Sequence, residues 1–149
     1  MNYTHISTAE KSGKLAARQS RDREFLEIYN QALELFIKQG VPNPKRLAVR
    51  WAISHGAPHY HVSYERAYKV INHILHKGHN PLLPSLQACM WQEIAERVRE
   101  LTESAGMSVA RAVEFVLAHC RASRFFVTEH YAYATLVDRA RKERSPRRV

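Results

Sequence analysis

Two stretches of this chain share their sequence without a gap. Residues 57–71 read APHYHVSYERAYKVI, and residues 122–136 read ASRFFVTEHYAYATL. The identical pairs are Ala57 with Ala122, Val62 with Val127, Ala67 with Ala132 and Tyr68 with Tyr133, and we call the constant separation of these pairs the repeat spacing. Upstream, the apolar positions Phe25, Leu26, Tyr29, Leu33 and Phe36 meet Met90, Trp91, Ile94, Val98 and Leu101 at the same spacing. Because chance would rarely preserve both identities and helical phase, the sequence predicts a tandem duplication of one module.

Each copy is predicted to contain three helices, so the predicted fold class is all-α. The first helix of each copy has apolar residues at i, i+3, i+7 and i+10, which form one face of a helix. Asn43 and Ser108 are good N-caps for the second helices, and Ser63 and Thr128 are good N-caps for the third. The expected helices span 21–39, 44–55 and 64–77 in the first copy, and 85–104, 109–120 and 129–142 in the second.

A short extended stretch precedes the third helix of each copy. It reads HYHV at 59–62 and RFFV at 124–127, and such aromatic and branched residues favour extended backbone. An aromatic edge strand without a partner is an aggregation liability, so the two stretches are expected to pair as a minimal antiparallel ribbon. The alternative is that each stretch is a loop packed on the core.

Turn residues and basic ends mark the expected boundaries. Gly78, Pro81 and Pro84 favour a linker between the copies. The expected order is a basic, flexible N-terminal arm (1–20), the first copy (21–77), a linker (78–84), the second copy (85–142) and a basic, disordered tail (143–149), with the two copies sharing one core.

The matched aromatic positions are expected to form the core, because apolar residues meet apolar residues at helical phase. These pairs are Trp51 with Val116, Trp91 with Leu26, Tyr60 with Phe125 and Tyr68 with Tyr133. Tyr64 and Tyr131, near the start of the third helices, are the exception. If exposed, they would suit stacking on bases or contact with a protein partner.

The net charge of +9 is concentrated at the two ends of the chain. Residues 1–23 contribute +3 and residues 143–149 contribute +2, so 30 of the 149 residues carry +5. Basic arms of this kind suit a polyanion partner, because they can follow phosphates and release counterions. The competing interpretation is that both ends are solvated tails without a role.

The second and third helices of each copy invite comparison with a helix-turn-helix DNA reader, in which the last helix lies in the major groove. The connector of about seven residues is longer than the usual three or four, so a scaffold role for the third helix is the alternative. The candidate nucleic-acid-binding residues are Arg66, Lys69, Asn72, His73 and Lys77 on the third helix of the first copy, Arg141, Lys142, Arg144, Arg147 and Arg148 near the C-terminus, and Lys11, Lys14 and Arg18 in the N-terminal arm.

Nine histidines raise the question of a metal site. His59 and His61 would point to the same side of an extended stretch, and His73, His76 and His79 fall at steps of three. Zinc needs about four converging ligands, and the second copy keeps none of the histidines at 59, 61 and 73. Neither cysteine belongs to a CxxC pair, and no catalytic or phosphate-cradling motif is present. We therefore expect no metal, no cofactor and no enzymatic activity.

The resulting hypothesis is a small basic protein that binds nucleic acid, in the first place double-stranded DNA through its phosphates, in an accessory or regulatory role. The alternative is a non-enzymatic protein–protein interaction or assembly module, which includes a homo-oligomer. A continuous positive face would favour the first, and an exposed apolar patch of several hundred Å² would favour the second. With no apolar run near the ~20 residues that span a bilayer and no signal-peptide pattern, a cytoplasmic protein without a membrane partner is expected.

Overall fold

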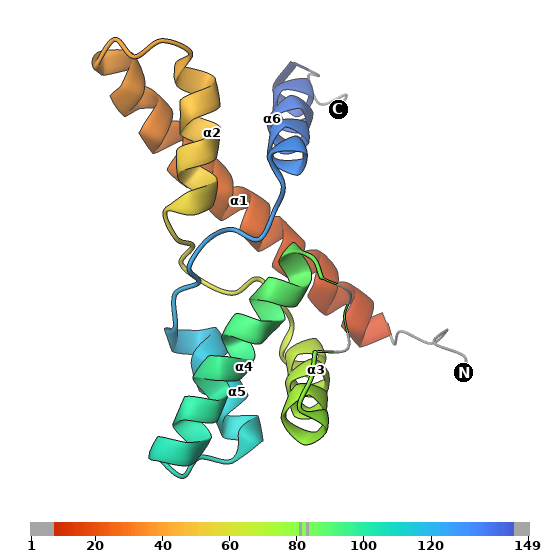
Figure 1. Cartoon of the computed structure of the whole chain (residues 1–149). Helices are drawn as coiled ribbons and strands as arrows, with labels where there is room; N and C mark the ends of the chain where they lie inside the picture. The colour runs from red at the N-terminus through yellow and green to blue at the C-terminus, as the bar shows by residue number, and fades with distance from the viewer. Residues whose placement is uncertain (1–7, 81, 83, 145–149) are drawn as a thin grey trace. The chain divides into compact units, whose positions relative to one another are not determined.

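The chain forms six α-helices in the computed structural model, which describes residues 8–80, 82 and 84–144, with side chains from residue 12 on (Figure 1). The helices are α1 (Thr8–Lys38), α2 (Pro44–Ser54), α3 (Tyr64–Lys77), α4 (Leu86–Ser104), α5 (Val109–His119) and α6 (Glu129–Arg144). The predicted all-α class is confirmed, and these residues contain no strand. Within the same ranges, no helix has the length and apolar character needed to cross a membrane.

The helices α2 to α6 lie within two residues of their predicted bounds, because most of the start signals act as expected. The side-chain oxygens of Ser63, Ser108 and Thr128 accept hydrogen bonds from backbone N–H groups three residues later, at 3.3, 3.3 and 3.1 Å. Asn43 is the exception, since its backbone is left-handed (φ 50°) and its side chain makes no capping hydrogen bond. The following Pro44 disfavours right-handed helical backbone at Asn43 and starts α2 with its own fixed φ.

The first helix is longer than predicted, because residues 8–20 are helical and do not form a flexible arm. This stretch is rich in Ala, Lys, Gln and Arg, which are good helix formers. Gly13 lets it approach the start of α3, since a Cβ atom in place of the Gly13 hydrogen would lie 3.2 Å from the Cβ of Ser63. At the other end of the chain, Glu143 and Arg144 belong to α6, and the rest of the predicted tail lies outside the described residues.

The helices are distributed over two compact units. Unit 1 comprises Met1–Arg21 and Pro58–Ala122, and unit 2 comprises Asp22–Ala57 and Ser123–Val149. In unit 1, α3, α4 and α5 pack on one another, whereas in unit 2 α2 packs against α6. Each unit thus combines the first two helices of one predicted copy with the third helix of the other. The units therefore differ from the sequential segments 21–77 and 85–142.

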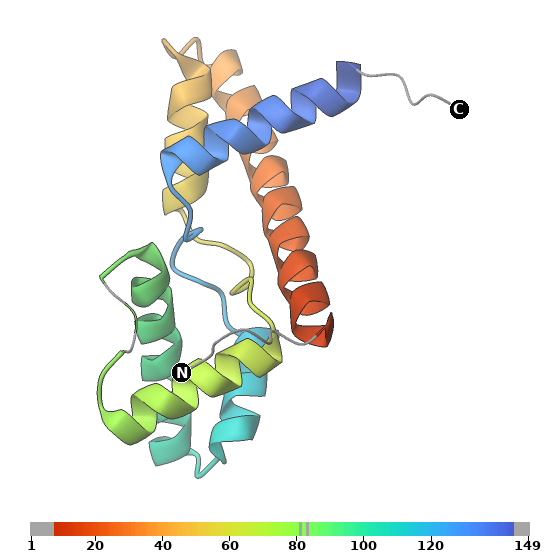
Figure 2. The same ribbon diagram turned by 90° about the vertical axis from the view of Figure 1, so that its right-hand side faces the viewer.

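The helices α3, α4 and α5 of unit 1 lie together (Figure 2), and one face of each contributes apolar side chains to a core. The buried residues recur at intervals of three or four, so that each helix turns one stripe inward. They are Ala67, Val70, Ile71 and Ile74 on α3, Ala88, Met90, Trp91, Ile94, Ala95 and Val98 on α4, and Ala112, Val113 and Val116 on α5.

Unit 2 is built around the second part of α1, with α2 running back beside it (Figures 1 and 2). Phe25 and Phe125 meet edge to face with ring centroids 5.7 Å apart. Tyr29 is also buried, and burial together with the nearby Tyr133 raises the pKa of its hydroxyl. The remaining buried side chains are Ala32 on α1, Ala48, Val49, Ala52 and Ile53 on α2, Ala57, Phe126 and Val127 in the connectors, and Ala132 on α6.

The predicted core is partly correct. Ala67 and Ala132 are fully buried, as expected for small residues at matched positions. Trp51, Tyr68 and Tyr133 were expected in the core, but each is 37% exposed. Matched apolar residues therefore do not all share one environment in the two units.

The stretches 59–62 and 124–127 are irregular connectors, so the predicted ribbon is not formed. Their backbone groups find partners nearby. The N–H of Phe125 donates to the C=O of Ile53 at 3.0 Å, and the guanidinium of Arg124 donates to the C=O groups of Phe125 and Val127. In the other connector, the N–H of Val62 donates to the C=O of Tyr60 at 3.1 Å. These hydrogen bonds take the place of a ladder between strands.

A polar cluster holds one connector to α4 in unit 1. The Tyr60 hydroxyl is buried and donates to Oε1 of Glu93 at 2.7 Å. Nη2 of Arg97 lies 3.9 Å from the same carboxylate oxygen. Burial and the hydrogen bond to Glu93 both raise the pKa of Tyr60, so its hydroxyl stays protonated and donating at neutral pH. The matching positions of unit 2, taken at the repeat spacing, hold apolar residues, namely Phe125, Ile28 and Ala32.

We expect Tyr60→Phe to lower the free energy of unfolding by about 1–2 kcal/mol, because the Glu93 carboxylate loses its donor. The triple variant Tyr60→Phe, Glu93→Ile, Arg97→Ala copies the residue types of unit 2. It should be less destabilised than the three single variants added together, since removing all partners leaves no group unsatisfied. Urea unfolding of the single and triple variants measures both effects. If the change in the triple variant equals the sum of the three single changes, the three side chains do not stabilise one another.

Candidate nucleic-acid interface

The exposed face of α3 has a basic flank and an aromatic flank. Arg66, Lys69, His73 and Lys77 fall at i, i+3, i+7 and i+11, a single line along the helix. Arg66, Lys69 and Lys77 are exposed, and His73 is partly exposed with its ring 5.9 Å from that of His79. The buried stripe of the same helix faces α4 and α5, so the basic line lies on the outer side of α3.

The aromatic flank of α3 consists of two tyrosines. The rings of Tyr64 and Tyr68 stack with centroids 6.1 Å apart, and both are more than a third exposed. Tyr64 thus fits the expectation of an exposed aromatic residue at the start of a third helix. Tyr131 does not, since it is partly buried and its hydroxyl lies 3.0 and 3.1 Å from the carboxylate oxygens of Asp22.

The first part of α1 adds cations beside α3. Gly13 approaches Ser63, the N-cap of α3, as described above. Lys14 and Arg18 follow on the same helix one turn apart, and both are exposed. No acidic residue occurs between positions 12 and 21. The structure thereby brings candidate residues from the predicted arm and the predicted reading helix into one unit. Lys11 belongs to α1, but its side chain lies outside the described residues.

The charge of unit 1 is separated between its helices. α3 carries three cationic residues (Arg66, Lys69, Lys77) and one glutamate, whereas α4 carries four glutamates and two arginines. A polyanion would therefore meet attraction along α3 and the first part of α1, and repulsion along α4. We call the surface formed by Lys14, Arg18, Arg66, Lys69, His73 and Lys77 the α1/α3 basic surface.

Three of the C-terminal candidates lie on α6 in unit 2. Arg141, Lys142 and Arg144 are exposed in the last turns of that helix, where cations interact favourably with the helix dipole. Arg147 and Arg148 lie outside the described residues. The candidates from the two ends of the sequence are thus assigned to different units.

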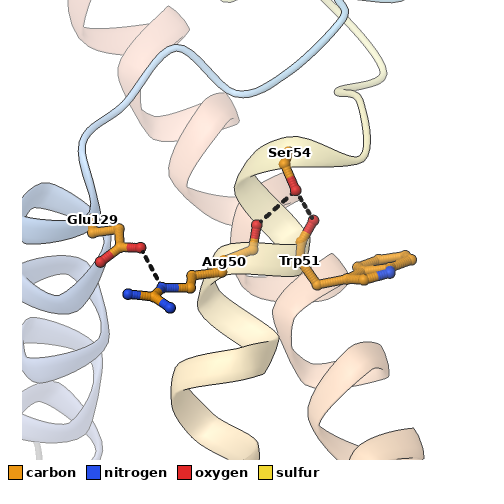
Figure 3. A network of polar contacts seen from close by, with 4 residues as sticks. All are labelled: Arg50, Trp51, Ser54 and Glu129. Carbon is orange, nitrogen blue, oxygen red and sulfur yellow. Dashed lines mark hydrogen bonds and ion pairs between the residues drawn. The ribbon is translucent and has the colours of Figure 1, made fainter.

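A second group of cations occurs on α2, and the sequence reasoning missed it. α2 contains Lys45, Arg46 and Arg50 and no acidic residue, and all three are exposed. Nε of Arg50 donates to Oε1 of Glu129 at 2.8 Å, while Trp51 points away from this ion pair (Figure 3). The segment 44–54 contains no carboxylate, and this feature could have indicated a basic helix between the chain ends.

The segment 44–77 does not form a helix-turn-helix element by itself. α2 belongs to unit 2 and α3 to unit 1, and α3 packs against α4 and α5. Likewise, α5 and α6 belong to different units. Asn72 is partly buried on α3, and its C=O accepts a hydrogen bond from Nδ1 of His76 at 2.8 Å. His59 and His61 are neighbours in unit 1, with ring centroids 6.3 Å apart.

Comparison of the chain with protein-family models, with curated proteins and with solved structures gave no match.

Proposed function

We propose that the protein binds nucleic acid through phosphate contacts of the α1/α3 basic surface. The observation that carries this proposal is the approach of Gly13 to Ser63, because Lys14 and Arg18 follow Gly13 on α1, and Arg66 and Lys69 follow Ser63 on α3. Exposed lysine and arginine side chains neutralise phosphates and release counterions, so such a surface attracts a polyanion without reading its sequence.

The aromatic flank of α3 agrees with this function. Tyr64 and Tyr68 expose stacked rings along the same helix as the basic line. The polar ends of Arg66 and Lys69 are suitable for phosphates or for guanine edges. An accessory or regulatory role is part of this proposal.

We also propose that the two sets of helices descend from one duplicated module whose third helices exchanged places. The helices α2 and α5 begin at Pro44 and Val109, and α3 and α6 begin at Tyr64 and Glu129, so both pairs of helix starts keep the repeat spacing. Each unit then contains one first, one second and one third helix of the module. Superposition of α4, α5 and α3 on the second part of α1, α2 and α6 tests this proposal, and different helix paths would refute it.

The nucleic-acid proposal predicts a steep dependence of affinity on salt. Five exposed cations on the α1/α3 basic surface imply a slope of about −4 in the logarithm of the binding constant against the logarithm of salt concentration. The double variant Lys14→Ala, Arg18→Ala should reduce the steepness by about 2, because two phosphate contacts are lost. Electrophoretic shifts of a random duplex over a salt series measure the slope.

Arg99→Ala, Arg111→Ala is the matched control, since it removes two exposed arginines from α4 and α5 of the same unit. The control should leave the slope unchanged. Equal effects of the two double variants would show that net charge alone matters and that the α1/α3 basic surface is not the site. If the intact protein binds neither duplex nor single strands at low salt, the nucleic-acid function is wrong and an interaction module takes its place.

A further inference from the structure

The outer face of α2 in unit 2 presents an aromatic pair to solvent. The indole of Trp51 and the imidazole of His55 lie nearly parallel, with ring centroids 4.3 Å apart and planes inclined by 15°. His55 is held in this position because its Nδ1 lies 3.0 Å from the C=O of Trp51. One face of the indole is therefore covered by the imidazole, and the side chain remains 37% exposed.

Unit 1 presents a similar pair on α5. The rings of Phe115 and His119 have centroids 4.8 Å apart, and Phe115 is 39% exposed. In both pairs the two residues are four positions apart, and the pair lies at the end of the second helix of its predicted copy. The two rings of this second pair are inclined by 50°, so they are in contact but not stacked as Trp51 and His55 are.

The two pairs occupy the same place relative to most of the buried positions of their helices. α2 buries positions 48, 49, 52 and 53, and α5 buries 112, 113 and 116, so three buried positions correspond, while Ile53 meets the partly buried Leu117. In this register Trp51 matches Phe115 and His55 matches His119. The residues that match in this way are one position closer in sequence than residues at the repeat spacing. At the repeat spacing, Trp51 instead meets the buried Val116.

The chemistry of α2 favours an anionic, aromatic ligand. Lys45 and Arg46 are exposed in the first turn, and α2 contains no carboxylate. Arg46 lies five and Lys45 six residues before Trp51, about 7.5 and 9 Å along the helix axis and more than about 100° around it, and the positive end of the helix dipole adds to their charge. A strand that continues from a base stacked on the indole around the first turns of α2 would bring its phosphates to these cations. Unpaired bases combine a flat π-face with such a backbone, whereas the bases of a duplex expose no free face.

We propose that Trp51, supported by His55, stacks on unpaired bases of single-stranded nucleic acid, with Lys45 and Arg46 contacting the adjacent phosphates. This inference rests on the proposed nucleic-acid function and adds a second, structure-selective site to it. Phe115 and His119 form a weaker counterpart, because Glu114 stands beside Phe115 where α2 has Arg50 in the same register. Arg50 itself is occupied by Glu129.

Tryptophan fluorescence tests this proposal, because the other tryptophan, Trp91, is buried in unit 1. Titration with a single-stranded oligothymidylate should quench the fluorescence of the intact protein. The quenching should disappear in Trp51→Phe, in which only the buried Trp91 reports. A duplex with the same number of phosphates should bind without comparable quenching.

Affinity provides the second readout. Trp51→Ala should weaken binding of the single strand about 5- to 150-fold, as expected from the loss of stacking on one base, and should leave duplex binding unchanged. Trp51→Phe should retain part of the affinity, and Phe115→Ala should have a smaller effect than Trp51→Ala. Circular dichroism verifies that each variant is folded.

The outcomes separate this inference from the proposed function. Binding of single strands without quenching, and without an effect of Trp51→Ala, would overturn the stacking site while leaving phosphate binding intact. Loss of duplex and single-strand affinity to the same extent in Trp51→Ala would also overturn it, since stacking requires an unpaired base. Absence of any binding by the intact protein would refute both proposals.

Discussion

Phe125→Ala is expected to destabilise unit 2 by about 3–5 kcal/mol, the range observed when a buried phenylalanine is truncated. Phe125 is 1% exposed and meets Phe25 edge to face, and its N–H donates to the C=O of Ile53. It therefore connects the segment before α6 to both α1 and α2. Truncation leaves a cavity at a junction of three segments that cannot easily collapse.

Urea unfolding measures this effect, with Phe115→Ala as the matched control. Phe115 has the same side chain but lies largely on the surface of α5, so its truncation should cost less than about 1 kcal/mol. Hydrogen exchange locates the effect, because amides of α2 and α6 should lose more protection than those of α4 and α5. Similar losses for the two phenylalanine variants would contradict the assignment of Phe125 to the core.

Ile71→Ala is the second large effect that we expect, at about 2–5 kcal/mol. Ile71 is fully buried on α3, between the faces of α4 and α5 in unit 1. Its counterpart at the repeat spacing, Leu136 on α6, is only partly buried. Leu136→Ala should therefore cost clearly less, although the two changes remove similar side chains.

The location of the Ile71→Ala effect tests the exchange of third helices. Hydrogen exchange should show lost protection in α4 and α5, the helices that pack on α3. If protection is lost first in α2, then α3 packs on the helices of its own predicted copy, and the division into units is wrong. Urea unfolding supplies the free energies for both variants.

The helices of this protein could be predicted from local signals. Caps such as Ser63 and Ser108, and the apolar period of α3 to α5, act over one or two turns, and their information is contained in neighbouring residues. The helical start of α1 was missed because basic composition was taken as a sign of disorder. Contact with Ser63 through Gly13, which supports this part of α1, is not visible in its own sequence.

The partners of the helices could not be predicted in the same way. If α3 and α6 exchange places between the two three-helix sets, every helix keeps its bounds. Only the helices against which α3 and α6 pack are changed. A sequence in which Ala67 matches Ala132 is equally compatible with both arrangements, since both alanines are buried in either case. The exposed position of Trp51 depends on a shift of one residue in the buried face of α2, beside the left-handed Asn43. The sequence does carry a signal for this shift, because at a spacing one residue shorter Ala48, Val49 and His55 meet Ala112, Val113 and His119.

For the candidate site, residue types were easier to predict than their grouping. Lys14, Arg18, Arg66 and Lys69 were chosen as cations of an arm and of a reading helix, and the structure assigns all four to unit 1. The cations of α2 were not predicted as part of a site, because they lie neither at the chain ends nor on the third helices. Their importance comes from the exposed indole on the same helix, which only the packing of unit 2 reveals.

The exchanged helices also determine the order in which the protein can fold during synthesis. Every residue of unit 1 has been added to the chain once Ala122 is made, whereas the first segment of unit 2, ending at Ala57, lacks α6 until residues 129–144 have also been made. At about 5–20 residues per second, the segment between the two parts of unit 2 takes about 3–13 s to translate. For that time Phe25 and Ile53 lack their contacts with Phe125. A nascent chain of this protein is therefore expected to need a chaperone most while its second half is being made.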